Sequence, residues 1–189
     1  MIKFIEMKED LKNKDFYKDL YNDAFPPEER WNFDMTLENK HNDNYKFYGI
    51  LDDDTPIGLT MLWDLDDFNY GEYLAIDKKF RGNKYGTEVL TKILKILSDK
   101  LIVIEVEPYD LNEIAKKRIE WYQRFGLILS DYDYNMPCID ENKNISSIKM
   151  KIMTSRKIQN KEEHDNIAKI LYNRIYKPRL DELDKWKYN

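Results

Sequence analysis

The sequence predicts a mixed α/β fold, in which helices flank a central, mostly antiparallel sheet that contains one parallel strand pair. Short apolar or alternating segments bounded by turn residues indicate the strands, and amphipathic stretches of helical period indicate the helices. A helix between two buried strands forms a crossover, which places those strands parallel and adjacent. The expected parallel pair is 70–76 and 101–106, joined by a helix at 83–99.

The first part of the chain predicts one strand, two helices and a meander. Residues 2–7 alternate as a strand does, and apolar residues then recur at helical spacing from Phe16 to Phe25. Pro26 and Pro27 end that helix, because proline has no N–H for the hydrogen-bond ladder. A short second helix is expected over 31–40. The meander that follows has the strands 45–51, 57–64 and 70–76.

The second part predicts a helix, two strands and a further helix. The helix at 112–125 ends at Gly126, a residue typical of helix C-termini. Strands at 127–134 and 146–154 are expected to close the sheet in antiparallel pairing. Apolar residues at helical spacing predict a last helix at 164–176, ended by Pro178.

The charge distribution divides the chain into an acidic body and a basic extension. Residues 1–154 carry 22 basic and 30 acidic side chains, and residues 155–189 carry 9 basic and 6 acidic ones. We expect one domain over 1–154 and a helical extension over 155–189 that packs on the body or forms a homodimer contact. An acidic body repels nucleic acid and favours a cationic amine as substrate.

Several classes of protein are disfavoured by composition. No apolar run approaches the roughly 20 residues that span a bilayer, and the N-terminus is too polar for a signal peptide. Cys138 is the single cysteine, which fits a reducing cytoplasm without disulfides. His41 and His164 do not have the spacing of a metal cluster, so we expect no metal and no membrane partner.

The segment from Tyr73 to Thr87 carries the strongest functional signal. An apolar strand ends at Ile76, and the glycine-bearing loop Arg81–Thr87 opens an amphipathic helix. Backbone N–H groups at a helix N-terminus lack intrahelical partners, and the helix dipole favours an anion there. The loop therefore predicts a cofactor-phosphate site, although Gly82 and Gly86 also suit a simple tight turn.

A second motif strengthens this interpretation. The helix sequence Trp121-Tyr122-Gln123-Arg124-Phe125-Gly126-Leu127 follows the loop and the strand at 101–106. Together these motifs resemble the GNAT superfamily of N-acetyltransferases, whose acetyl-CoA loop reads Arg/Gln-x-x-Gly-x-Gly/Ala. Residues 24–30, Ala-Phe-Pro-Pro-Glu-Glu-Arg, are similar to an N-terminal signature of a bacterial subgroup, and we call them the signature segment.

The resemblance implies a GNAT-like fold and acetyl-CoA as co-substrate. It implies that the strand ending at Ile76 splays from its parallel neighbour and pairs through its main chain with the pantetheine arm. Lys84 replaces the usual middle glycine; if that position requires a positive φ, the cost is about 1–2 kcal/mol. The implied cofactor-binding residues are Leu74, Ile76, Arg81, Gly82, Asn83, Lys84, Tyr85, Gly86 and Thr87.

Two side chains are candidates for catalysis. Glu72 would act as the base toward the acceptor amine, and period-two alternation places it on one face with Leu74 and Ile76. Glu105, on the neighbouring strand, is the alternative base, or it holds a structural hydrogen bond. The resemblance implies that Tyr122 donates a proton to the departing CoA thiolate; packing beside aromatic neighbours is its structural alternative.

The favoured hypothesis is an acetyl-CoA-dependent N-acetyltransferase that acts on a small-molecule or peptide amine. A non-catalytic acyl-CoA-binding module is the alternative, because Lys84 and the uncertain base leave room for it. A methyltransferase is less favoured, because its glycine-rich loop follows the first strand of its fold. Aromatic residues of the expected acceptor region are interpreted as core: Phe25, Trp31, Tyr45 and Trp63.

Overall fold

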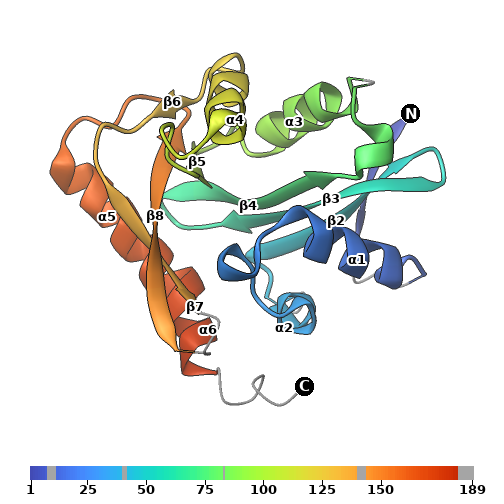
Figure 1. Cartoon of the computed structure of the whole chain (residues 1–189), viewed down its shortest axis with the longest axis horizontal. Helices are drawn as coiled ribbons and strands as arrows, with labels where there is room; N and C mark the ends of the chain where they lie inside the picture. The colour runs from blue at the N-terminus through green and yellow to red at the C-terminus, as the bar shows by residue number, and fades with distance from the viewer. Residues whose placement is uncertain (8–11, 40–41, 83, 140–143, 183–189) are drawn as a thin grey trace. The chain divides into compact units, whose positions relative to one another are not determined.

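A computed structural model describes residues 1–7, 12–39, 42–82, 84–139 and 144–182 of the chain (Figure 1). The described residues form two compact units, which divide after Val103. Unit 1 runs from Met1 to Val103 and unit 2 from Ile104 to the C-terminus.

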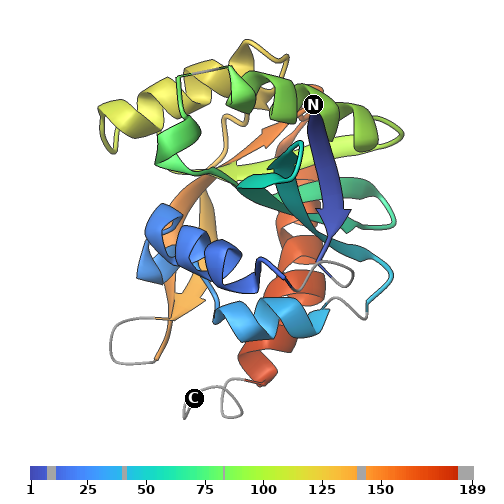
Figure 2. The same cartoon turned by 90° about the vertical axis from the view of Figure 1, so that its right-hand side faces the viewer.

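Unit 1 is a twisted sheet covered by helices on both faces. The strand order is β1-β2-β3-β4-β5, with antiparallel pairing from β1 to β4. The crossover through α3 makes β4 and β5 the parallel pair. Helices α1 and α2 cover one face and α3 the other (Figure 2). The elements are β1 (Ile2–Glu6), α1 (Lys14–Ala24), η1 (Pro27–Glu29), α2 (Phe33–Glu38), β2 (Tyr45–Asp52), β3 (Thr55–Asp64), β4 (Phe68–Ile76), η3 (Lys78–Phe80), α3 (Tyr85–Ile96) and β5 (Leu101–Val106), which continues into unit 2.

Two glycines allow the layers of unit 1 to approach closely. A Cβ at Gly49 would lie 2.2 Å from the Tyr17 hydroxyl of α1. A Cβ at Gly58 would lie 2.5 Å from the Ala75 carbonyl oxygen of β4. Neither position has room for a larger residue, so the packing of α1 and β4 on β2 and β3 depends on these glycines.

Unit 2 is built around the long strand β8. Antiparallel β6 pairs with one end of β8 and antiparallel β7 with the other, while β5 lies on its other side (Figure 1). Helices α5 and α6 run beside the β7–β8 hairpin (Figure 1). The elements are α4 (Glu113–Gln123), β6 (Ile128–Leu129), β7 (Tyr134–Ile139), β8 (Ile145–Thr154), α5 (Lys161–Leu171), the π-helical turn η4 (Tyr172–Tyr176) and α6 (Lys177–Asp181).

The predicted fold class is confirmed, and the strand at 101–106 has the expected bounds. The predicted strand at 127–134 is wrong in its extent, because it breaks at Ser130, whose hydroxyl accepts a hydrogen bond from the Tyr132 N–H. A separate strand, β7, then extends to Ile139. The division of the chain at residue 154 stays a prediction.

The prediction that Pro178 ends the last helix is also wrong. The π-helical turn η4 closes with a hydrogen bond from the Lys177 N–H to the Tyr172 carbonyl, directly before the proline. Pro178 then lies in the first turn of α6, where a missing N–H costs no helical hydrogen bond. The change in hydrogen-bond register therefore lets the helical path continue past the proline.

Candidate cofactor-binding and catalytic residues

The loop from β4 to α3 folds back onto the end of its own strand. The Asp77 side chain accepts a hydrogen bond of 2.9 Å from the Lys79 N–H, which caps η3. The exposed Arg81 donates its Nε to the Ile76 carbonyl at 3.0 Å. Arg81 thus braces the loop, and the Ile76 carbonyl already accepts one hydrogen bond, from its guanidinium.

Among the described residues, no side chain caps the first-turn amides of α3. Lys84 is the N-cap residue, and its side chain makes no capping hydrogen bond. Gly82 and Lys84 have φ values of 86° and 64°, which turn the chain sharply into the helix. Gly86 and Thr87 lie in the first turn, half-buried and exposed respectively. Asn83, also predicted to bind cofactor, lies outside the described residues.

Lys84 has the positive φ that the sequence comparison with the usual glycine anticipated. A left-handed conformation costs a residue with a Cβ about 1–2 kcal/mol. Its side chain is exposed, so its ammonium is accessible to an anion at the start of α3. Strain of this kind persists where the surrounding structure enforces it, and it clusters at binding sites.

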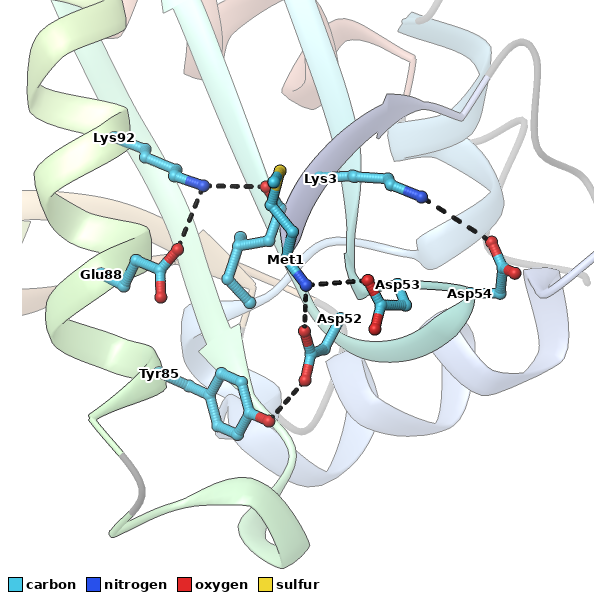
Figure 3. Close-up of polar contacts among 9 residues, drawn as sticks. Met1, Lys3, Asp52, Asp53, Asp54, Tyr85, Glu88 and Lys92 are labelled. Carbon is cyan, nitrogen blue, oxygen red and sulfur yellow. Dashed lines mark hydrogen bonds and ion pairs between the residues drawn. The ribbon is translucent and has the colours of Figure 1, made fainter.

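The side chain of Tyr85 bonds to Asp52 and is therefore not available to bind phosphate. Its hydroxyl donates to Asp52 at 2.6 Å, and Asp52 also accepts from the Met1 ammonium at 2.8 Å (Figure 3). The hydrogen bond to Asp52 raises the pKa of Tyr85. Lys92, which lies further along α3, donates a hydrogen bond of 2.8 Å to the Ile2 carbonyl. These contacts fix α3 against β1 and the β2–β3 turn. The backbone N–H is the part of Tyr85 that is left to bind a cofactor phosphate.

The predicted strand partners of the cofactor, Leu74 and Ile76, lie at the C-terminal end of β4. Leu74 pairs with Thr60 and Ile76 pairs with Gly58 across the β3–β4 ladder. The other edge of β4 faces β5 in the strand order. Leu74 is half-buried and Ile76 is buried, so their side chains serve the packing of unit 1.

Glu72 occupies a β-bulge. Met61 pairs with Tyr73 and Leu62 pairs with Gly71, which leaves Glu72 as the extra residue of β4. Bulges re-aim side chains and are frequent beside active sites. A glycine inside a strand pattern is a recognised signal of a bulge, and Gly71 was that signal in the sequence.

The bulge corrects the predicted orientation of Glu72. Its carboxylate accepts a hydrogen bond of 2.8 Å from the Trp63 indole N–H. Trp63 shares the α1-facing side of the sheet with Tyr73, whereas Leu74 and Ile76 alternate to the opposite face. The extra residue breaks the period-two alternation, so Glu72 does not share a face with Leu74 and Ile76. It is half-buried on the α1-facing side.

Aromatic side chains share the α1-facing side of the sheet with Glu72. The Trp63 ring packs on Tyr45 with centroids 4.6 Å apart, and both are buried. Tyr73 packs on Phe25 at 4.7 Å. Trp31 is buried as well, so Trp31, Tyr45 and Trp63 agree with the interpretation as core, whereas Phe25 is half-buried.

The signature segment is tied to this same region. Arg30 donates to the Asn22 and Phe25 carbonyls at 2.6 Å each, which satisfies the C-terminal end of α1. The Tyr73 hydroxyl donates to the Glu29 carbonyl at 2.8 Å. Sequence reasoning gave no role to Arg30 or Tyr73. Together they fix the segment beside the strand that carries Glu72.

Tyr122 lies in the last turn of α4, which ends in a glycine C-cap as predicted. Gly126 has a φ of 86°, its N–H donates to the Gln123 carbonyl at 2.9 Å, and the Leu127 N–H donates to the Tyr122 carbonyl at 3.3 Å. This pair of hydrogen bonds is a Schellman motif. The Tyr122 ring packs against Trp121 with centroids 5.0 Å apart.

The Tyr122 phenol is suited to remain protonated. Burial raises the pKa of Tyr122, and the nearby Arg118 guanidinium opposes that shift. Within the described part of the chain, its hydroxyl has no hydrogen-bond partner. Asn112, the residue directly before α4, accepts from the Ile114 and Ala115 N–H groups and thus caps the start of the helix. Its position is fully explained by that structural role.

Glu105, the alternative base, contacts two tyrosines of unit 2. The Tyr176 hydroxyl donates to its Oε2 at 2.5 Å. Burial raises the pKa of the Tyr134 phenol, and the Glu105 carboxylate raises it further. Glu105 therefore holds the structural hydrogen bond that was one of its two predicted roles.

The described ranges contain no group of three or more His, Cys, Asp and Glu side chains arranged to hold a metal ion. No helix in them is both long and apolar enough to cross a membrane. Cys138 is a buried cysteine of β7.

Comparison with known families matches residues 12–127 to the acetyltransferase (GNAT) family. YjbC of Bacillus subtilis (strain 168) is 34% identical over 67 residues, which are 35% of this chain and 34% of YjbC. The match thus spans about a third of the length of that curated relative.

Comparison with solved structures finds similar folds over most of the chain. A GNAT-family protein of Bacteroides thetaiotaomicron has a TM-score of 0.80 and 30% identity, over 93% of this chain and 98% of that one. The ribosomal-protein-S18-alanine N-acetyltransferase of Escherichia coli has a TM-score of 0.59 and 14% identity, over 85% of this chain and 98% of that one. The second likeness concerns the fold alone.

Proposed function

Since the chain belongs to the acetyltransferase (GNAT) family, we propose that it transfers an acetyl group from acetyl-CoA to a primary amine of a small molecule or peptide. The family uses acyl-CoA donors, and no metal is needed, because the thioester is already activated. The amine attacks the thioester carbon directly, the C–S bond breaks, and CoA leaves as its thiol.

The open start of α3 is the observation that carries the proposal. Uncapped first-turn amides and the exposed Lys84 ammonium form a site for an anion, directly after the strand that ends at Ile76. A diphosphate uses several such donors at once. Gly82, Lys84, Gly86 and Thr87 would hold it, with Asn83 and the Tyr85 N–H as further members, and Arg81 would brace the loop or add charge.

The base has to remove a proton from the acceptor. An alkylamine of pKa ~10.4 is almost fully protonated at pH 7, and presenting it neutral costs about 4.6 kcal/mol. Glu72 supports this role because a bulge turns its carboxylate to the α1-facing side, among buried aromatics. Glu105 remains the alternative base.

The acid has to protonate the departing thiolate. Tyr122 supports this role, because burial raises the pKa of its phenol and its hydroxyl is not committed to another described residue. A phenol donor and a thiolate near pKa ~8.5 are close enough for proton transfer. The aromatic packing of Trp121 holds the ring in place.

The family subgroup, the location in the cell, the domain division and the class of acceptor are also proposals. The signature segment supports membership of a bacterial subgroup of the family, and the bacterial origin of the relatives compared above supports it too. We propose a cytoplasmic enzyme, with a catalytic domain over 1–154 and an extension over 155–189 that packs on it or joins a homodimer. The name of the Escherichia coli neighbour supports keeping peptide amines among the acceptors.

Thiol release tests the proposal. Purified protein is incubated with acetyl-CoA and a panel of polyamines, aminoglycosides, amino acids and N-terminal peptides, and free CoA is measured. Amine-dependent thiol release is expected with at least one class. Binding of CoA without any amine-dependent release would instead favour a non-catalytic acyl-CoA-binding module.

A further inference from the structure

Tyr85 is the first residue of α3 and directly follows Lys84. Its ring packs on Phe80 of η3 in a T-shaped arrangement, with centroids 6.1 Å apart. Its hydroxyl donates to the Asp52 carboxylate at 2.6 Å, across 33 positions of sequence (Figure 3). The Tyr85 side chain thus joins the start of α3 both to the preceding loop and to the sheet of unit 1.

Asp52 is a well-anchored and charged acceptor for this hydroxyl. It lies at the end of β2, where it pairs with Ile2 of β1 and Thr55 of β3. The Met1 ammonium, and after it the Tyr85 hydroxyl, hold the pKa of Asp52 below its usual range. A hydrogen bond to an ionised acceptor is roughly twice as strong as one between neutral groups. The bond therefore ties α3 firmly to a strand that is held on both sides.

The loop between η3 and α3 is anchored at both of its ends. At its start, Arg81 donates its Nε to the Ile76 carbonyl at 3.0 Å, and at its end Tyr85 is held by the contact described above. The positive φ values of Gly82 and Lys84 lie between these anchors. A left-handed residue with a Cβ is unfavourable and persists where surrounding contacts enforce it. The anchor at Tyr85 can enforce it, because it lies one residue beyond Lys84.

The same anchor bears on the amides that would receive the diphosphate. The N–H groups of Gly86 and Thr87 lie in the first turn of α3, one and two residues beyond Tyr85. Groups that bind a ligand need a supporting shell of contacts that fixes their geometry. Lys92 fixes α3 further along, through the Ile2 carbonyl, whereas Tyr85 fixes the turn that carries these amides.

We propose that Asp52 is a positioning residue for the CoA diphosphate, and that it acts through the Tyr85 hydroxyl by holding the first turn of α3 in its binding geometry. The inference rests on the proposed function, in which the start of α3 binds the cofactor. It lies wholly within unit 1, and it adds a residue at the end of β2 to the determinants of cofactor affinity.

Calorimetric titration of CoA into full-length variants tests this role. Tyr85→Phe and Asp52→Ala should each weaken CoA binding about three- to tenfold, and the double variant should be no weaker than Asp52→Ala, because both residues act through one contact. The sign is diagnostic, since loss of a negative charge near an anion site would by itself tighten CoA binding. Tighter binding by Asp52→Ala, unchanged binding by Tyr85→Phe, or multiplied losses in the double variant would overturn the proposal.

Asp53→Asn is the matched control. Asp53 follows Asp52 directly and accepts from the same Met1 ammonium at 2.8 Å, but it is not the acceptor of the Tyr85 hydroxyl. Asparagine tolerates its φ of 53°. The variant should leave CoA affinity unchanged, which separates loss of a charge and of the Met1 contact from loss of the Tyr85 contact. A loss equal to that of Asp52→Ala would contradict the proposal.

A second acetyl donor separates positioning from a general loss of structure. Acetyl-pantetheine carries the thioester but lacks the diphosphate. In the thiol-release assay, Tyr85→Phe should raise the KM for acetyl-CoA, with kcat unchanged at saturating acetyl-CoA and kcat/KM for acetyl-pantetheine unchanged. Equal losses with both donors would refute the positioning role. If Asp52→Ala does not fold, Tyr85→Phe decides alone by the same criteria.

Failure of this inference is distinguishable from failure of the proposed function. Wild-type protein that binds no CoA contradicts the cofactor site of the proposed function. Wild-type protein that binds CoA, with Tyr85→Phe and Asp52→Ala equal to it in affinity, contradicts only the role of Asp52.

Discussion

The start of α3 and the end of α4 both contain a residue in the left-handed conformation, but they are built differently. At the end of α4 that residue is Gly126, and backbone hydrogen bonds to Gln123 and Tyr122 close the helix. The next residue, Leu127, is buried with 2% of its surface exposed. At the start of α3 the residue is Lys84, which is exposed and makes no capping hydrogen bond.

Packing explains the left-handed residue at the end of α4, but it does not explain the one at the start of α3. Glycine adopts a positive φ without steric cost, and the Schellman motif satisfies the carbonyls of α4. Lysine adopts it at a cost, and its side chain leaves the first amides of α3 uncapped. We infer that the closed end positions Tyr122, whereas the open end awaits an anionic ligand.

The largest effect is expected at the closed end, from Tyr122→Phe. General acids contribute roughly 10²–10⁴-fold to rate, so kcat should fall about 100-fold while acetyl-CoA affinity is retained. Because burial raises the pKa of Tyr122, the wild-type rate should not lose this acid until above about pH 10. Steady-state kinetics check both points, and Tyr85→Phe is a control that removes another hydroxyl. An unchanged kcat in Tyr122→Phe would remove the acid role.

Gly86→Val should have the next largest effect, at the open end. Side-chain bulk in the first turn of α3 should obstruct the diphosphate and weaken CoA binding by about 10- to 100-fold, equivalent to roughly 1.4–2.8 kcal/mol. Calorimetric titration measures the affinity. Retained affinity would place the diphosphate elsewhere in the molecule.

Gly126→Ala should lower the stability of the fold and leave CoA binding unchanged, which would distinguish the end of α4 from the start of α3. A Cβ at φ 86° meets no atom within 4 Å, so backbone strain alone acts, at about 1–2 kcal/mol. Denaturant unfolding should show this loss, with CoA affinity unchanged in the folded protein. A large loss of CoA affinity would show that the closed end, too, is built for the ligand.

Lys84→Gly should have the smallest effect and the opposite sign. Relief of about 1 kcal/mol of left-handed strain should raise the melting temperature of a domain of this size by about 2–4 °C. Loss of the ammonium should weaken CoA binding slightly, more at low salt than at high salt. Thermal unfolding at matched ionic strength tests the first part. A lower melting temperature would mean that Lys84 has a stabilising contact.

Local patterns predicted most of the fold. Period-two and helical spacing located the meander, the crossover and the C-cap at Gly126, because these signals lie within a few residues of one another. The bulge at Glu72 was missed, since one extra residue reverses the alternation on which the prediction depended. Gly71 was the available signal.

Contacts between distant segments could not be predicted from such patterns. The Tyr85 hydroxyl reaches Asp52, and the Tyr176 hydroxyl reaches Glu105, across 33 and 71 positions. Nothing in the local sequence of either tyrosine specifies its partner. The π-helical turn is a similar case, because its extra residue conforms to neither period and the pattern favoured an end at Pro178.

A crystal of the wild-type protein soaked with CoA tests the central claim most directly. The account predicts diphosphate oxygens within hydrogen-bonding distance of the backbone N–H groups of Gly86 and Thr87, with the Lys84 ammonium nearby. Density for CoA at another place, or none at saturating concentration, would contradict the assignment of the open end of α3 as the cofactor site.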